Sequence, residues 1–151
     1  MNNLNTLLTA FENVISKQEK LNLTVSKSSI GWHIEHIFLT TTLVIEALNK
    51  SNPSNYKWRF NVPKLIVFTF KKIPRGRAKA PKIATPETFN EQILREHFKS
   101  VMIKVQELNN IDKDKYFKHP FFGHLKLNEA IKFLEIHAEH HLKIVHDILN
   151  K

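Results

Sequence analysis

Four stretches of the chain carry apolar residues at the spacing of three and four positions that is typical of amphipathic α-helices. The predicted helices cover residues 4–18, 29–50, 85–108 and 127–149. Ser29 is a favourable cap for the start of the second helix, and Thr85-Pro86 combines a cap residue with a proline at the first helical position. The second stretch is apolar on almost every side, which predicts that it is the most buried helix.

The segments between these helices differ in length. Residues 51–84 form a long connection that contains four of the six prolines. Within it, NVPKLIVFTFKK at 61–72 is compatible with either a short helix or a strand, and IPRGRAKAPK at 73–82 is expected to be an extended loop. Residues 109–127 are expected to form the last loop. The pattern predicts an all-α, four-helix bundle in one domain, residues 1–151, with a long crossover that makes the second and third helices parallel and the fourth antiparallel to both.

Composition narrows the chemistry of the chain. There is no cysteine, which excludes disulfides, thiolate metal ligands and a cysteine nucleophile. The first twenty residues lack the basic and continuously apolar segments of a signal peptide, and no apolar run is long enough to span a bilayer. We therefore expect a cytoplasmic protein with no membrane partner.

Histidines occur in the apolar faces of the second and fourth helices. Since a helix turns about 100° per residue, His137 and His141 lie about 40° apart, in the middle of the apolar stripe of the fourth helix. His36 shares a face of the second helix with Leu39 and Leu43. His36 lies about as far from the start of the second helix as His137 and His141 lie from the end of the fourth helix. In antiparallel helices, the three imidazoles therefore converge in one layer.

Inward imidazoles need partners, because an unpaired buried polar group costs about 1–3 kcal/mol. Two histidines four residues apart can bind one metal ion, and a third from another helix completes a three-histidine site with an open position. We predict that His36, His137 and His141 bind one divalent metal ion, zinc or nickel in preference to others. The competing interpretation is three core histidines, each bonded to a backbone carbonyl or a neighbouring side chain.

The other histidines have different predicted roles. His33 lies about 60° from His36 on its helix and is a candidate base if it approaches the site. His97 lies in the apolar stripe of the third helix and is predicted to be structural or to support the ligands. His140 lies at the margin of the stripe of the fourth helix. Three further histidines are expected to be structural or to face water: His119, His124 and His146.

The net charge of +9 is located in one segment, because residues 51–83 contain nine Lys or Arg and no acidic residue. If the second and third helices are parallel, the end of this segment lies beside the histidines. Four basic residues are then predicted to surround the site and bind a small anionic ligand: Arg75, Arg77, Lys79 and Lys82. The alternative is a solvated loop whose charge only favours solubility. Nucleic-acid binding, which would depend strongly on salt, is disfavoured because the segment contains no recognition-helix motif.

Four motifs occur in order along the chain: SSIGWHIEH at 28–36, IPRGRAKAPK at 73–82, HPFFGHL at 119–125 and HAEHH at 137–141. With these motifs the sequence resembles the DinB-like superfamily, and in particular a branch of it whose function is unknown. Its members are bacterial four-helix bundles that bind a divalent metal ion through one histidine of the second helix and an H-x-x-x-H pair of the fourth. By this resemblance, the ligands would again be His36, His137 and His141.

The resemblance also implies classes of activity. Characterised relatives include transferases and isomerases that use bacillithiol, mycothiol or glutathione, and others are described as metal-dependent hydrolases. After His141 the chain reads LKIV, where many relatives have an Arg-Gly-Gln run. We expect a metal-dependent hydrolase or a transferase that depends on a low-molecular-weight thiol, with a non-catalytic metal-binding or ligand-binding protein as the alternative. The sequence identifies no catalytic residue and leaves the oligomeric state open, a homodimer included.

Overall fold

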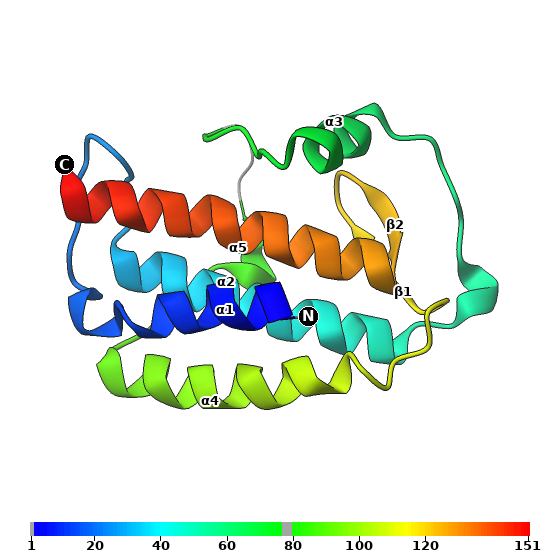
Figure 1. The fold of residues 1–151 in the computed structure, drawn as a ribbon, viewed down its shortest axis with the longest axis horizontal. Coiled ribbons are helices and arrows are strands. Elements are labelled where there is room, and N and C mark those ends of the chain that lie inside the picture. The colour runs from blue at the N-terminus through cyan, green and yellow to red at the C-terminus, as the bar shows by residue number, and fades with distance from the viewer. Residues whose placement is uncertain (1, 77–79) are drawn as a thin grey trace.

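The protein is mainly helical in the computed structural model, which describes residues 2–76 and 80–151. Its helices are α1 (Asn2–Glu12), α2 (Ile30–Lys50), α3 (Val62–Phe70), α4 (Glu91–Glu107) and α5 (Leu127–Asn150), and its strands are β1 (Tyr116–His119) and β2 (Gly123–Lys126). The helices α1, α2, α4 and α5 lie side by side, and α3 packs against the outer side of α5 (Figure 1). Among the helices of the described residues, none combines the length and the hydropathy that crossing a bilayer requires.

The directions of the helices follow from the side chains that join them. Three pairs connect α2 to α4 in ascending order along both helices: Glu35 with His97, Glu46 with Lys104, and Asn49 with Glu107. These two helices are therefore parallel, as the colours of Figure 1 also show. His33 contacts His141 and His36 contacts His137, so α5 runs antiparallel to α2.

The start of α2 is fixed by a cap and by close packing. Ser29 accepts a hydrogen bond from the backbone N–H of Trp32 at 3.4 Å, as the sequence predicted. A Cβ atom on Gly31 would lie 2.6 Å from the ring of Phe89, so glycine lets this ring approach the helix backbone. More residues are buried on α2 than on α4 or α5, which agrees with its uniformly apolar sequence. These contacts hold the first turns of α2, where the histidines lie, in a fixed position.

The predicted start of the third helix is wrong. That helix, α4, begins at Glu91 and not at Thr85. Asn90 caps it by accepting a hydrogen bond from a backbone N–H of the first turn. The Thr85 hydroxyl donates to the carbonyl of Pro81 at 3.0 Å, which ties Thr85 to the preceding turn. The chain before α4 forms a short 3₁₀ helix, Lys82–Ala84, that lies against α2.

Two other segments differ from a simple four-helix pattern. The predicted first helix is shorter than residues 4–18, because α1 ends at Glu12 and a 3₁₀ helix, Ile15–Lys17, follows it after a turn. The apolar run in the crossover, for which helix and strand were both compatible, is helical. Asn61 caps this helix, α3, by accepting a hydrogen bond from the N–H of Lys64 at 2.8 Å.

A β-hairpin occupies part of the segment predicted to be a loop, residues 109–127. Phe117 on β1 pairs with Leu125 on β2, and both side chains are buried. Gly123 has a φ of 75°, a left-handed conformation that glycine adopts without steric cost. Each strand has four residues, which is too short to give a clear alternation of apolar and polar positions.

Candidate metal centre

The structure brings His36, His137 and His141 together in the layer between α2 and α5. One ring nitrogen of each residue lies within 4.8 Å of those of the other two. His36 and His141 are buried, and His137 is partly buried. The helical geometry inferred from sequence therefore places these three side chains correctly, and the cluster is one that could hold a metal ion.

The orientation of His36 is set by a backbone carbonyl. Its Nδ1 donates a hydrogen bond to the Ala84 carbonyl oxygen at 2.6 Å. A carbonyl oxygen can only accept, so the proton of the neutral ring resides on Nδ1. The Nε2 atom of His36 is therefore an acceptor, and Nε2 of His137 donates to it at 3.3 Å. The 3₁₀ helix that contains Ala84 thus determines which nitrogen faces the cluster.

His137 has an unsatisfied nitrogen on the other side of its ring. Among the described residues, its buried Nδ1 has no hydrogen-bond partner. The ring is stacked on Phe133 with an interplanar angle of 14°. This stacking and the contact with His36 fix the ring, although one polar atom is left unpaired in the interior. Such atoms are rare in native proteins because each costs about 1–3 kcal/mol.

His141 is held by a chain of hydrogen bonds that leads to the surface. Its Nδ1 lies 2.8 Å from Nδ1 of His33, and Nε2 of His33 lies 3.0 Å from the Ser26 hydroxyl. If His141 donates to His33 and His33 donates to Ser26, Nε2 of His141 has a free lone pair. The Ser26 oxygen also accepts from the N–H of Ser28 at 3.1 Å, which is consistent with this direction. The arrangement is of the kind that orients a metal-ligating imidazole.

The whole cluster favours neutral imidazoles. Burial, and then the proximity of His36, lower the pKa of His137 well below its usual value. Burial, and then His137, do the same to the pKa of His141. Burial also lowers the pKa of His36, although the hydrogen bond to Ala84 partly opposes this effect. Metal coordination requires the neutral form of histidine, so the site is in the protonation state that a metal ion needs at neutral pH.

Two further histidines surround the cluster. His33 is buried, and its pKa is lowered to about 4, chiefly by burial and then by His36. The pKa of His140 is also lowered to about 4, by burial and then by Arg75. Helical geometry predicts that His33 lies about 60° from His36 on its helix, but it does not predict the direct contact between His33 and His141. That contact depends on the distance between α2 and α5.

The predicted anion-binding residues have different surroundings. Arg75 forms an ion pair with Asp147 of α5 at 2.9 Å, and its charge lowers the pKa of the nearby His33. Lys82 is exposed at the start of the 3₁₀ helix that contains Ala84. Arg77 and Lys79 lie outside the described residues. The structure therefore brings Arg75 near His33 and His140.

A buried carboxylate lies next in sequence to His36 but faces α4. Glu35 is 6% exposed and binds Nδ1 of His97 through both oxygens at 3.0 Å. This pair explains why His97 lies in the apolar stripe of α4, and it gives His97 a structural partner. Sequence reasoning did not identify Glu35, since a single acidic residue in a helix gives no signal of burial. Its partner is 62 residues away along the chain.

The remaining histidines are mostly structural, as predicted. His124 accepts a hydrogen bond from the N–H of Lys57 at 2.9 Å and stacks on Tyr116. His146 is exposed. His119 accepts hydrogen bonds from two backbone N–H groups of the hairpin turn and contacts the ring of Phe133. It therefore lies one aromatic ring away from His137.

Comparisons with protein-family models, with curated proteins and with solved structures gave no match. The likeness to DinB-like proteins accordingly rests on the four motifs in the sequence. The three-histidine cluster and the fold are described by the structure, independently of that likeness.

Proposed function

We propose that the protein is a metal-dependent enzyme of the DinB-like type, with one divalent ion bound by His36, His137 and His141. In this proposal α1, α2, α4 and α5 form a four-helix bundle in a single domain, residues 1–151. The parallel α2 and α4, the antiparallel α5 and the contacts of α1 with α4 and α5 support the bundle. The long connection between α2 and α4 is the crossover that the resemblance implies.

The contact between His36 and His137 is the main observation in support of a bound metal ion. Their Nε2 atoms are 3.3 Å apart, which is long for an N–H···N hydrogen bond. Two nitrogens bound to the same tetrahedral Zn²⁺ are separated by about 3.3 Å, because each Zn–N bond is about 2.0–2.1 Å. The Nδ1 atom of His137 has no partner among the described residues, so only one of its two nitrogens is paired. The donor set therefore fits a metal ion such as zinc or nickel.

The side chains around the ligands would control their orientation. When bound, the ion would supply Lewis acidity that polarises a substrate group or lowers the pKa of a coordinated water or thiol. His33 orients His141, and both of its nitrogens are already engaged, so we assign it this positioning role and not that of a base. Trp32 stacks on His36 with an interplanar angle of 14° and limits the rotation of that ring.

We propose a small anionic substrate for this site. Arg75 lies close to His33 and His140, where burial first and the charge of Arg75 among other causes lower the pKa of both rings. Lys82 lies two residues before Ala84, whose carbonyl holds His36. A hydrolase or a transferase that depends on a low-molecular-weight thiol is consistent with such an anion and with the resemblance. The substrate would enter from the side of the 3₁₀ helix that contains Lys82.

Metal analysis of the purified, untagged protein tests the proposal. One zinc or nickel ion per chain is expected after reconstitution, and His36→Ala, His137→Ala and His141→Ala should each abolish high-affinity binding. His146→Ala is the matched control, because His146 lies on the same helix as two of the ligands but is exposed. The proposal would be overturned if the three ligand variants retained the metal fully and had native circular dichroism spectra.

A non-catalytic metal-binding protein is the second candidate. The buried carboxylate nearest in sequence to His36, Glu35, is occupied by His97 and is not free to act as a base. Both nitrogens of His33 are engaged as well. If the reconstituted protein binds one metal ion but turns over neither activated esters and phosphoesters nor thiol conjugates, this second function is supported.

A further inference from the structure

Helix α3 has apolar residues on both of its faces. The inner face packs against the molecule through Val67, which is buried, and Phe68, whose ring contacts Phe122 of the hairpin. Four residues of the outer face are more than half exposed: Val62, Leu65, Ile66 and Phe70. A helix at the surface normally has polar residues on its outer face. Packing within the molecule therefore does not explain why the exposed face of α3 is apolar.

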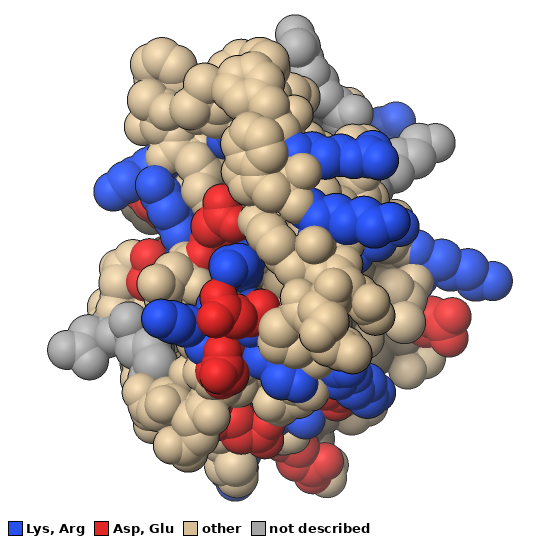
Figure 2. Space-filling model, turned by 90° about the vertical axis from the view of Figure 1, so that its right-hand side faces the viewer, with Lys and Arg blue, Asp and Glu red and all other residues tan. Residues whose placement is uncertain are grey.

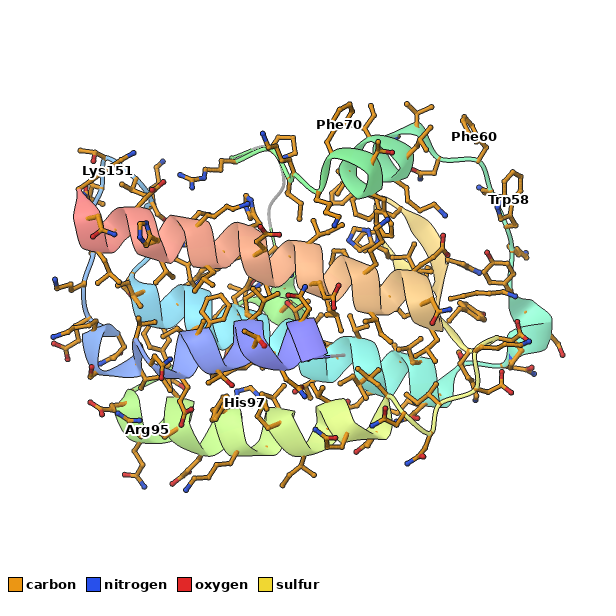
Figure 3. The ribbon with its side chains drawn as sticks, viewed as in Figure 1. Trp58, Phe60, Phe70, Arg95, His97 and Lys151 are labelled. Atoms are coloured by element: carbon orange, nitrogen blue, oxygen red, sulfur yellow. The ribbon has the colours of Figure 1, made fainter. Side chains whose placement is uncertain are left out.

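The apolar surface continues beyond α3. Trp58 and Phe60 precede the helix and are each 69% exposed, and Phe121 at the tip of the hairpin is also exposed. The Asn61 side chain donates a hydrogen bond to the Phe121 carbonyl at 2.8 Å, which joins the two segments. Figure 3 shows Trp58, Phe60 and Phe70 pointing away from the body of the molecule. We call these seven residues the outer apolar patch: Trp58, Phe60, Val62, Leu65, Ile66, Phe70 and Phe121.

Basic side chains border the outer apolar patch. Lys57 and Arg59 alternate with Trp58 and Phe60, and Lys71 and Lys72 follow Phe70 directly. All four of these basic side chains are exposed. Within the described part of the chain, none of them forms an ion pair. The uppermost part of the face in Figure 2 shows Lys and Arg beside uncharged residues and no Asp or Glu. The nearby Glu129 is bound by Lys64.

We propose that this surface binds the anionic face of a lipid bilayer. Exposed aromatic and aliphatic side chains surrounded by Lys and Arg are the composition of segments that lie in the membrane interface. The apolar residues would enter the boundary between headgroups and acyl chains, while the basic residues contact anionic headgroups. The expectation from sequence that there is no membrane partner considered only a spanning segment, and this contact would be peripheral. It is independent of metal binding.

Two other occupants fit the charge and the polarity less well. A symmetric dimer through this patch would place the basic residues of one copy against those of the other, since the same surface occurs on both sides of a two-fold interface. Nucleic acid would satisfy the basic residues but would leave seven exposed apolar side chains without a role, because such interfaces are more polar than those between proteins. A bilayer with anionic lipids satisfies both kinds of side chain.

Co-sedimentation with lipid vesicles tests the proposal. The protein should bind vesicles of phosphatidylcholine mixed with phosphatidylglycerol, bind phosphatidylcholine alone far more weakly, and lose affinity as salt is added. Phe60→Ser with Phe70→Ser should lower the partition coefficient by roughly a hundredfold, since each ring leaves water on binding. Lys71→Gln with Lys72→Gln should lower it by roughly thirtyfold. All four side chains are exposed, so the fold should be unaffected.

Matched controls lie elsewhere on the surface. Leu23→Ser with Ile103→Ser removes two exposed apolar side chains outside the patch, and Lys99→Gln with Lys113→Gln removes two exposed charges. Both controls should bind like the unaltered protein. Equal loss in the controls would overturn the proposal. Absence of vesicle binding would also overturn it. In that case, a dimer that dissociates in Phe60→Ser with Phe70→Ser would assign the patch to a second copy of the chain, and duplex DNA binding that this variant retains would assign the basic residues to nucleic acid.

Discussion

The carbonyl of Ala84 decides which nitrogen of His36 faces the other histidines. The other two histidines differ in the partner of the same ring atom. Nδ1 of His141 is hydrogen-bonded to His33, and Nδ1 of His137 has no partner among the described residues. Helical periodicity predicts the face on which a histidine lies, because it depends only on the angle per residue. It does not predict which ring nitrogen points inward, since that depends on groups from distant parts of the chain.

Substitution of His33 tests its positioning role. His33→Phe keeps an aromatic ring but removes the hydrogen bond to Nδ1 of His141, so the metal affinity should fall by roughly 10–100-fold while the stoichiometry stays at one ion per chain. Titration with a metal-competing indicator dye measures the affinity. Ser26→Ala, which shortens the same chain by one member, should have a smaller effect. If His33→Phe eliminates binding altogether, His33 is a ligand and not an orienting residue.

His119 should make the metal-free protein less stable in acid. Burial lowers its pKa from 6.5 to about 4, and its Nδ1 accepts two backbone hydrogen bonds that protonation would break. A folded-state pKa below the unfolded value means that the contribution is complete above about pH 6.5 and is lost as the pH falls toward 4. The shift corresponds to on the order of 3 kcal/mol.

Urea denaturation at pH 7.5 and pH 4.5 measures this contribution. The free energy of unfolding should change less between the two pH values in His119→Phe than in the unaltered chain, although the variant is less stable at both. His146→Phe, at an exposed position, should leave the difference unchanged. An equal pH dependence in His119→Phe and the unaltered chain would contradict the assigned cause.

At the scale of secondary structure, α2 connects the two sides of the molecule. Within four residues it presents His33 and His36 to α5 and Glu35 to α4. The sequence was sufficient for the main helices and for the cap at Ser29, because a long apolar periodicity and a local cap are both encoded nearby. It was not sufficient for the hairpin, whose strands are too short for a pattern, or for the start of α4. There, the hydroxyl of Thr85 bonds to a carbonyl four residues earlier.

The pair of Glu35 and His97 should contribute to the packing of α2 against α4. Glu35→Ala leaves the imidazole without its partner, and the expected loss is about 1–3 kcal/mol in the free energy of unfolding. A double-mutant cycle with His97→Ala measures the coupling between the two residues. The exposed pair of Arg95 and Glu91 on α4 is the control, and its cycle should give no more than about 0.5 kcal/mol. A coupling energy between Glu35 and His97 of no more than about 0.5 kcal/mol, like that of the control pair, would refute this role.

At the scale of the whole molecule, the proposed site couples metal binding to folding. The ligands come from two helices that are adjacent only in the folded chain, so an ion that binds them stabilises the folded state by mass action. At a free metal concentration one hundred times the dissociation constant, the gain is about 2.7 kcal/mol. For a protein of this size, this corresponds to an increase in Tm of roughly 5–10 °C.

Thermal denaturation with and without zinc measures this coupling. The unaltered protein should show the increase in Tm, a chelator should reverse it, and His36→Ala should show none. His146→Ala should respond like the unaltered protein. An increase in His36→Ala as large as in the unaltered chain would place the stabilising ion elsewhere.

The separation of the ligands along the chain has a consequence for unfolding kinetics. His137 and His141 belong to one helix, whereas His36 is 101 residues away from His137. An ion held by all three would join positions this far apart in the chain, so it can keep all three ligands only while α2 and α5 are packed together. The pair on α5 can retain the ion as long as that helix persists. The rate at which a chelator captures the ion should therefore report how often α2 separates from α5, and not how often either helix unravels.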